Sequence, residues 1–224
     1  MSRFLDAKEF VDRARARSSA AAGARVLSLD DARARAEVAG PRWQLDDLTG
    51  RLTELSGVGA VASLTAATAL LLEAQQRGEP CAWILLPGSS FFPPDLAASG
   101  VDLEALVVVR TRDAITLARA ADTLLRSGSF GLVLLELGAT GELPMAAQGR
   151  LVSLAQRHDA ALVAITERPR DAASLGSIVS LRAEAVRERV RGGGFRVAVR
   201  AIKDKRRGPG WSQPVAVVPP VGWK

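Results

Sequence analysis

The segment from Gly57 to Leu64 stands where a phosphate-binding loop would join a strand to a helix. Such a loop needs Gly-x-x-x-x-Gly-Lys-Ser/Thr: the second glycine lets the backbone wrap a phosphate, the lysine neutralises its charge, and the hydroxyl ligates Mg²⁺. Gly57 keeps the first position, but Ala62, Ser63 and Leu64 replace the second glycine, the lysine and the hydroxyl. The loop therefore predicts at most weak anion binding by free backbone N–H groups, and no nucleotide hydrolysis.

Other side chains that carry chemistry are scarce. His158 is the only histidine and Cys81 the only cysteine, which argues against a metal cage, a Ser-His-Asp triad and an internal disulfide. A single cysteine suits a reducing compartment, and the opening residues lack the apolar stretch of a secretory signal. The uncharged run 55–72 contains Ser, Thr and Gly, so it predicts a buried helix and not a membrane span. We expect a cytoplasmic protein without metal, cofactor or membrane contact.

A basic tract runs from Arg182 to Arg207. It contains ten Lys or Arg residues and three acidic ones, whereas the whole chain carries a net charge of +6. Such a tract can attract nucleic acid or an acidic protein surface. Positive charge on the edge of a sheet also discourages aggregation, so a merely solubilising strand is equally compatible with the tract.

Apolar strands alternate with helices from Gly50 onward. The strands contain few polar residues, which is typical of a parallel sheet covered on both faces, and the helices show 3.6-residue spacing. The sequence therefore predicts an α/β fold with a doubly wound, mostly parallel sheet. The expected strands cover residues 51–56, 81–87, 105–110, 132–137 and 161–166, and the expected helices cover about 61–77, 113–126 and 145–157.

The pattern changes after residue 180. Residues 195–202 alternate as a strand with one polar face, and Gly192, Gly193 and Gly194 precede them as a turn. Residues 180–191 favour a helix by residue type, whereas a strand there would complete an antiparallel hairpin. Both possibilities are open from the local sequence, and the fold class that we expect includes the hairpin.

Three parts of the chain are expected to differ in organisation. Residues 1–49 predict an appendage with helices at about 4–18 and 30–38, residues 50–207 form the core, and residues 208–224 form an extended tail. Trp211 and Trp223 lie in this tail. They are equally suited to anchoring a partner or to packing back on the domain.

A series of short segments resembles the core of the bacterial recombinase RecA. Their order and spacing carry the resemblance, which covers about residues 50–207. In chain order the segments are GRLTELSG, the strand at Cys81, GVDLEALVV, LLRSGSFGLVLLEL, AAQGRLVSLAQR, LVAITE, VSLRAEA and AIKDK.

The resemblance also implies what has been lost. Pro87 stands at the position of the glutamate that activates water in RecA, Glu136 ends the strand that carries the magnesium-associated acid, and Glu167 replaces a nucleotide-sensing glutamine. The two DNA-gripping loops correspond to the shortened segments GATGELPM and RPRDAASLG. ATPase activity and recombinase-like DNA binding are therefore not expected.

One side of the RecA subunit interface is retained by resemblance. Lys203 and Lys205 match the lysine pair with which one protomer reaches the nucleotide of its neighbour, although two surface lysines on a strand end would look the same. A chain that presents these lysines but cannot hold ATP would cap or poison a filament. The candidate partner-binding residues are Lys203, Lys205, Arg206, Arg207 and Trp211.

Among RecA-like proteins with altered nucleotide sites, the chain most resembles the ImuA group. This resemblance implies an accessory role in SOS translesion mutagenesis, with RecA, the inactive Y-family polymerase relative ImuB and, through ImuB, an error-prone polymerase as partners. An inhibitor of cell division of the SulA type is an alternative, although those chains are shorter. A residual RecA-like ATPase and a plain DNA-binding protein are two further possibilities.

Overall fold

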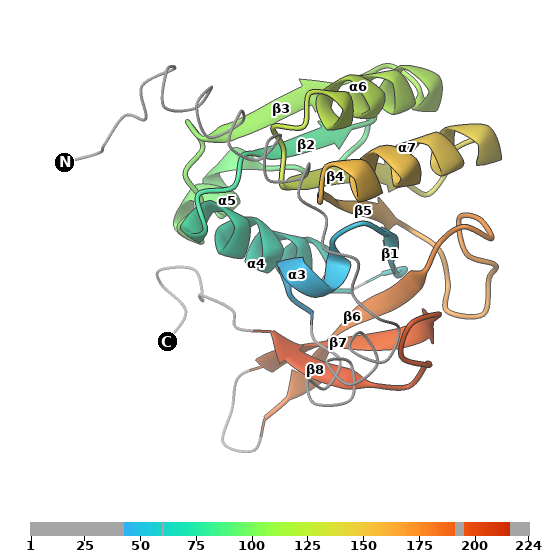
Figure 1. Cartoon of the computed structure of the whole chain (residues 1–224). Helices are drawn as coiled ribbons and strands as arrows, with labels where there is room; N and C mark the ends of the chain where they lie inside the picture. The colour runs from blue at the N-terminus through green and yellow to red at the C-terminus, as the bar shows by residue number, and fades with distance from the viewer. Residues whose placement is uncertain (1–42, 60, 191–194, 216–224) are drawn as a thin grey trace, which may run out of the picture.

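The computed structural model describes residues 43–59, 61–190 and 195–215 (Figure 1). Its centre is an eight-stranded sheet with the order β3-β2-β4-β5-β1-β6-β7-β8. Neighbouring strands from β3 to β6 are parallel, and β6-β7 and β7-β8 are antiparallel. The α/β fold with a mostly parallel sheet and a C-terminal antiparallel hairpin is thus confirmed. The strands are β1 (Leu52–Ser56), β2 (Cys81–Leu85), β3 (Leu106–Arg110), β4 (Leu132–Gly138), β5 (Ala161–Thr166), β6 (Leu181–Arg189), β7 (Phe195–Asp204) and β8 (Ser212–Val215).

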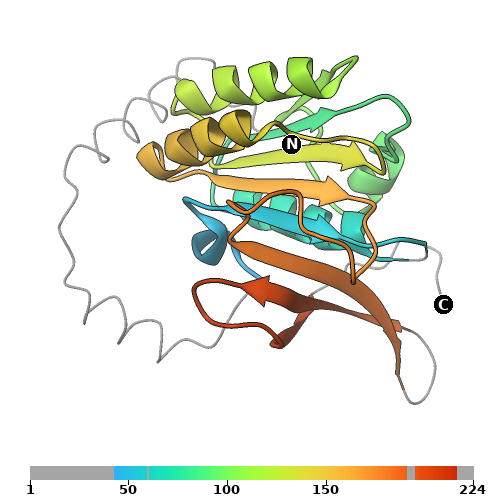
Figure 2. The same cartoon turned by 90° about the vertical axis from the view of Figure 1, so that its right-hand side faces the viewer.

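Helices cover both faces of the parallel part of the sheet (Figures 1 and 2). One face packs against α3 (Leu45–Leu48), α4 (Ser63–Gln76) and α5 (Pro93–Ala98), and the other against α6 (Ala114–Arg126) and α7 (Met145–Arg157). Each face has its own apolar core, because side chains alternate across a strand. The central strands β2 and β5 are buried at every position, as their unbroken apolar sequences predict.

The first residues of two helices are set by the local sequence. The Asp113 side chain accepts a hydrogen bond of 2.6 Å from Thr116 N and caps α6. Two prolines open α5, where the first helical turn has no use for their missing N–H groups. As a result α5 starts directly after Phe91 and Phe92, and these two aromatic side chains are held beside α4.

The open choice for residues 180–191 is decided in favour of a strand for Leu181–Arg189, which forms β6. Its pairing with β7 places Arg182 opposite Lys203 and Arg187 opposite Val197. The helix-forming residue types of this segment are overridden by tertiary pairing, since Leu181, Ala183 and Ala185 all enter the core.

The expected extended tail is partly wrong. Residues 212–215 form β8, which pairs antiparallel with β7 and extends the sheet. Trp211 is half-buried and packs against the core, so the structure shows it packing back on the domain. Trp223 and residues 216–224 lie outside the described residues.

The end of the expected N-terminal appendage belongs to the core. Trp43, Leu45 and Leu48 are buried, and the Trp43 indole donates to Ala66 O of α4 at 3.1 Å. The expected helices at about 4–18 and 30–38 lie outside the described residues. Within the part that is described, no helix is long and apolar enough to cross a membrane.

Candidate functional site

The loop between β1 and α4 is closed by its own chain. Val61 folds back so far that a Cβ added to Gly57 would lie 2.6 Å from its Cγ1. The loop amides also have partners: Gly57 N donates to Thr166 O at 3.2 Å, and Ala62 N donates to Ala185 O at 3.0 Å. Two amides of the loop therefore bind within the chain and are not free to bind an anion.

Ser63 and Leu64, the residues expected to stand at the lysine and magnesium-ligand positions, lie at the start of α4. Ser63 is buried, and among the described residues its hydroxyl has no hydrogen-bond partner. Leu64 is partly buried and packs against the apolar core. This helix start therefore presents neither a cation nor a metal-binding oxygen at the Leu64 position.

Glu136 lies near the end of β4 and is 5 % exposed. Its two carboxylate oxygens are both engaged by neutral donors: Trp83 Nε1 donates to Oε2 at 3.0 Å, and Ser90 N donates to Oε1 at 2.6 Å. Burial raises the pKa of Glu136, the two hydrogen bonds oppose that rise, and the charge of Glu167 adds to it. The carboxylate thus holds the segment after β2 in place.

A hollow of about 510 Å³ lies beside Glu136, where β2, β4 and β5 end and α6 begins. Pro87, Glu136 and Glu167 line it together with Arg112 and Asp113. Arg112 is the one cation among these lining residues, and its Nε pairs with the Asp113 carboxylate at 3.2 Å. A strongly anionic phosphate chain would meet more acid than base there.

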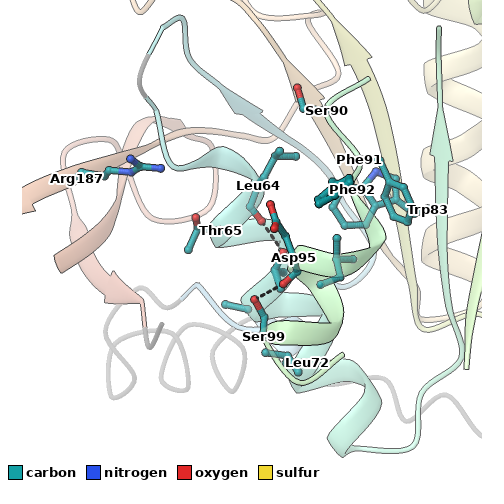
Figure 3. Close-up of a pocket in the computed structure, with 13 residues that line it drawn as sticks. Leu64, Thr65, Leu72, Trp83, Ser90, Phe91, Phe92, Asp95, Ser99 and Arg187 are labelled. Atoms are coloured by element: carbon teal, nitrogen blue, oxygen red, sulfur yellow. Dashed lines mark hydrogen bonds between the residues drawn. The ribbon is translucent and has the colours of Figure 1, made fainter. Parts of the chain in front are cut away.

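A second hollow, the α4–α5 groove, has a volume of about 260 Å³ and lies on the other side of the Trp83 segment. Trp83 and Phe91 contact each other edge to face, with ring centroids 5.1 Å apart. Figure 3 shows Leu64 and Phe92 facing this groove from α4 and from the start of α5, with Arg187 of β6 beyond them. Because Glu136 binds Trp83 and Ser90, the same carboxylate supports one wall of the groove.

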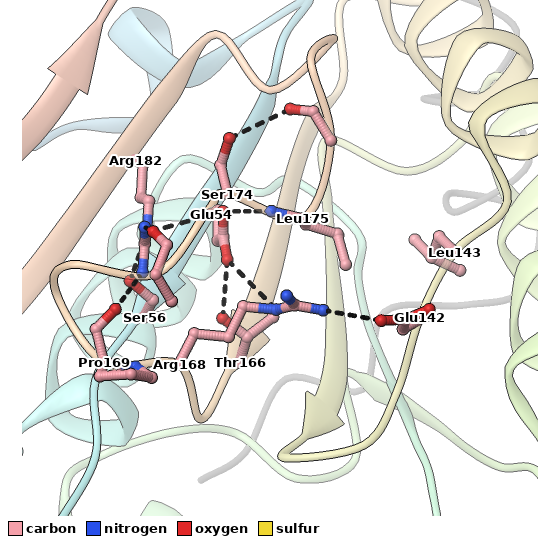
Figure 4. Close-up of polar contacts among 12 residues, drawn as sticks. Glu54, Ser56, Glu142, Leu143, Thr166, Arg168, Pro169, Ser174, Leu175 and Arg182 are labelled. Atoms are coloured by element: carbon pink, nitrogen blue, oxygen red, sulfur yellow. Dashed lines mark hydrogen bonds and ion pairs between the residues drawn. The ribbon is translucent and has the colours of Figure 1, made fainter.

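The buried carboxylate of Glu54, in the middle of β1, organises the loop that follows β5 (Figure 4). Its oxygens accept hydrogen bonds from Thr166 Oγ1 at 2.9 Å and from Leu175 N at 2.8 Å. Arg168 and Arg182 add ion pairs at 3.9 and 3.8 Å. Strand β1 and the stretch from Thr166 to Arg182 therefore meet at one charge.

Arg182 and Arg168 extend this cluster into two loops. Arg182 donates to the carbonyl oxygens of Pro169 and Ala172, and Arg168 pairs with Glu142 at 3.6 Å. The segments GATGELPM and RPRDAASLG, which resemble shortened DNA-gripping loops, are thus both attached to the core.

Gln148 of α7 joins the same two loops from the other side. It is 1 % exposed, and its Nε2 donates to Leu143 O at 2.8 Å and to Leu175 O at 3.2 Å. Gly176 is needed here, because an added Cβ would lie 2.2 Å from Gln148 Oε1. The loop after β5 is therefore held by close packing in addition to the Glu54 cluster.

The lysine pair at the end of β7 contacts its own chain. Lys203 Nζ lies 3.4 Å from Ser174 Oγ, and Lys205 Nζ donates to Ser177 O. Burial, followed by the neighbouring charge of Lys205, lowers the pKa of Lys203. The two lysines lie close enough for their charges to interact, and Lys205 is the exposed one of the pair.

The neighbouring candidates Arg206, Arg207 and Trp211 surround a buried ion pair. Arg51 and Asp204 are 2.8 Å apart, and their side chains are 4 % and 2 % exposed. Trp211 Nε1 donates to Asp204 Oδ2 at 3.1 Å, Arg206 reaches Thr49 O at 3.4 Å, and Arg207 pairs with Asp47 at 2.5 Å. Burial opposes ionisation of Asp204, but the hydrogen bonds from Arg51 and Arg206 N lower its pKa.

Two of the ten basic residues of the tract are paired within the described part of the hairpin. Glu188 binds Arg196 and Arg200, each at 2.6 Å, and these hydrogen bonds lower the pKa of Glu188. Glu184, a second acidic residue of the hairpin, pairs with Arg170, which lies outside the tract. Among the described residues no group of three or more His, Cys, Asp or Glu side chains is placed to hold a metal ion.

Comparison with known proteins relates part of the sequence to protein RecA. The chain is 29 % identical to protein RecA of Rickettsia massiliae over 120 residues, which cover 48 % of this chain and 34 % of the relative. It is 28 % identical to RecA of Rickettsia prowazekii over a stretch of the same length. This chain is similar to RecA.

The similarity to RecA has a limited extent. The chain spans about a third of the length of these curated relatives, and no family model matches it. The comparison therefore supports a RecA-like relationship for about half of the chain. The narrower resemblance to the ImuA group remains a prediction.

Sequence reasoning missed the residues that build the α4–α5 groove and the loop attachments. The motif FFPPD carried a signal for the groove, since an aromatic pair before two prolines marks a helix start with apolar neighbours. Glu54 also carried one, because a carboxylate in the middle of an apolar strand needs buried partners. Gln148 and Gly176 had no local signal, as their contact joins residues from distant segments.

Proposed function

We propose that this protein is a non-catalytic relative of RecA that serves as an accessory subunit in damage-induced translesion mutagenesis. The observation that carries the proposal is the state of Glu136, whose carboxylate is bound by Trp83 and Ser90. A magnesium-associated acid must instead face the nucleotide. The closed Gly57 loop and Leu64 at the metal-ligand position support the same conclusion.

The partners that we propose are RecA and ImuB, with an error-prone polymerase recruited through ImuB. Similarity to RecA supports docking on a RecA filament, and resemblance to the ImuA group supports ImuB. Lys203, which is partly buried, and Lys205, which is exposed, are the proposed contacts with a RecA protomer. Direct DNA binding is proposed to be weak, because Glu188 already pairs with Arg196 and Arg200.

The catalytic half of the proposal is tested by ATP turnover of the purified chain and of Glu136→Gln, which keeps the shape of the side chain. We expect no turnover in either protein. Turnover in the natural chain that disappears in Glu136→Gln would overturn the proposal and would favour a residual RecA-like ATPase.

The RecA half is tested by titrating the chain into RecA on single-stranded DNA while following ATP turnover by RecA. Capping predicts inhibition at well below one chain per RecA protomer. The variant K203A/K205A should lose this effect, whereas R119A/R157A, which removes two exposed arginines from α6 and α7, should keep it. Equal inhibition by both variants would rule out the lysine surface.

A titration without any effect on RecA would remove the RecA contact. The accessory role would then depend on ImuB alone, and copurification of ImuB with the chain would test it. Failure of both experiments would overturn the proposed function.

A further inference from the structure

The α4–α5 groove is an apolar cleft with charges at its rim. Leu64, Leu72 and Phe92 supply apolar surface, and Phe92 is 55 % exposed although it is a large aromatic side chain. Asp95 and Arg187 line the same groove and carry opposite charges (Figure 3). Such a cleft is suited to an apolar peptide segment with a basic residue at the Asp95 end.

The chain itself contains a segment of this chemistry. Residues 216–224 read AVVPPVGWK: they contain three valines, one tryptophan, one lysine and no acidic residue. They follow Val215, the last residue of β8, directly. This composition matches the apolar groove and its carboxylate.

The register of the sheet brings the start of this segment close to the groove. Val215 is paired with Val197, and Val197 is paired with Arg187, which lines the groove. Val215 and Val197 both pack against the same apolar core as Leu64 and Leu72. Two strand spacings, about 10 Å in total, therefore separate Val215 from the backbone of Arg187.

We propose that residues 216–224 bind the α4–α5 groove of the same chain, with the Trp223 indole against Phe92 and the Lys224 ammonium beside Asp95. Nine residues reach up to about 30 Å when extended, which exceeds the separation across two strands. A tryptophan side chain buries roughly 150–250 Å² of mostly apolar surface, and a groove of about 260 Å³ can take its ring system. Pro219 and Pro220 lower the entropy lost on binding, because polyproline geometry is already extended.

The proposal is tested with the full chain carrying two added cysteines, Thr65→Cys in the groove and Gly222→Cys beside Trp223, so that Phe92 and Trp223 are both kept. Thr65 is partly exposed and close to cysteine in size, so its replacement is not expected to disturb folding. If the segment lies in the groove, mild oxidation should give an intramolecular disulfide, since a bond forms only when the two Cα atoms come within about 7 Å. The matched control pairs Gly222→Cys with Ile115→Cys, which is 59 % exposed on α6, on the opposite face of the sheet.

We expect at least about tenfold more intramolecular disulfide with Thr65→Cys than with Ile115→Cys, because a bound segment has a high effective concentration at one site only. Peptide mass spectrometry locates the bond and excludes the buried Cys81. Equal yields for the two pairs would overturn the proposal. A disulfide found only between two chains would overturn it as well, and would indicate that the groove takes this segment from a second copy.

A second measurement avoids cysteine chemistry. Hydrogen exchange at residues 91–96 should become faster in Trp223→Ala than in the natural chain, and the amides of α7 should be unchanged. Unchanged exchange at residues 91–96 would also contradict the proposal.

Discussion

Two buried glutamates of the central sheet differ in the charge of their partners. Glu54 in β1 meets the guanidinium groups of Arg168 and Arg182 as well as two neutral donors. Among the described residues, Glu136 in β4 has only the neutral donors Trp83 and Ser90 as hydrogen-bond partners. Both carboxylates are almost fully shielded from solvent.

The two carboxylates therefore have different structural roles. Arg182 and Arg168 beside Glu54 also bind backbone carbonyl oxygens and Glu142, so one buried carboxylate attaches two loops to the core. Neutral donors around Glu136 leave its charge poorly compensated, and its pKa rises because burial outweighs the hydrogen bonds. The Glu54 site therefore attaches loops, and the Glu136 site has a raised pKa that makes it sensitive to pH.

Glu54→Ala should produce the largest loss of stability. Removing the carboxylate leaves Arg182, whose side chain is 3 % exposed, buried without its acidic partner. Breaking a buried ion pair in this way costs about 3–5 kcal/mol in free energy of unfolding. Urea unfolding of the full chain measures the loss.

Glu142→Ala is the matched control for Glu54→Ala. Glu142 pairs with Arg168 in the same cluster, but its side chain is 82 % exposed. Its replacement should leave the urea midpoint almost unchanged. A loss as large as that of Glu54→Ala would mean that the exposed pair, and not the buried carboxylate, attaches the loops.

Glu136→Ala should have the next largest effect. It leaves the Trp83 indole N–H and the Ser90 amide without their acceptor, and an unsatisfied buried donor costs about 1–3 kcal/mol. The loss should come with faster hydrogen exchange at residues 90–92, because Ser90 N is released. A stable variant with unchanged exchange would show that the carboxylate does not hold this segment.

The pH dependence of Glu136→Gln sharpens the comparison further. Because the pKa of Glu136 is higher in the folded chain than in the unfolded chain, the folded state binds more protons between the two values. The natural chain should lose stability relative to Glu136→Gln as pH rises from about 4.5 through the raised pKa, by up to about 1.4 kcal/mol per pH unit. A constant difference in unfolding midpoint across this window would contradict a raised pKa.

The sequence predicts the layers better than the contacts between distant segments. Unbroken apolar runs such as 81–85 and 161–166 can only be central strands, and the structure places them there. For residues 181–189 the sequence could not decide between helix and strand. Local propensity says nothing about the strand with which they pair, because that strand lies beyond a turn. Residues 212–215 gave no signal, since proline and glycine surround a strand of only four residues.

The candidate site also contains features that the sequence predicts and contacts that it does not. Substitutions in the phosphate-binding pattern, such as Leu64, can be found from spacing alone. The partners of Glu136 cannot, because Trp83 and Ser90 meet it only after β2 and β4 pair and the chain turns into α5. Phe92 and Arg187, two of the residues that line the groove, are 95 residues apart in sequence and come together only in the folded sheet.

The smallest effect on stability is expected from Glu188→Ala, which extends the comparison to exposed charges. Arg196 and Arg200 would lose their shared acidic partner, but both remain in solvent, so the unfolding midpoint should change little. Binding to single-stranded DNA should respond instead. Freeing two arginines should steepen the dependence of log K on log salt by about 1.4, at roughly 0.7 per neutralised phosphate.

Glu104→Ala controls for net charge in this experiment, because it removes one acidic residue next to β3, at the opposite edge of the sheet. Fluorescence anisotropy at several salt concentrations measures both variants. A steeper slope for Glu188→Ala alone would mean that internal pairing is what keeps the hairpin from binding DNA. Equal slopes in both variants and the natural chain would mean that these arginines do not face DNA at all, which would leave the basic tract as a protein-binding or solubilising surface.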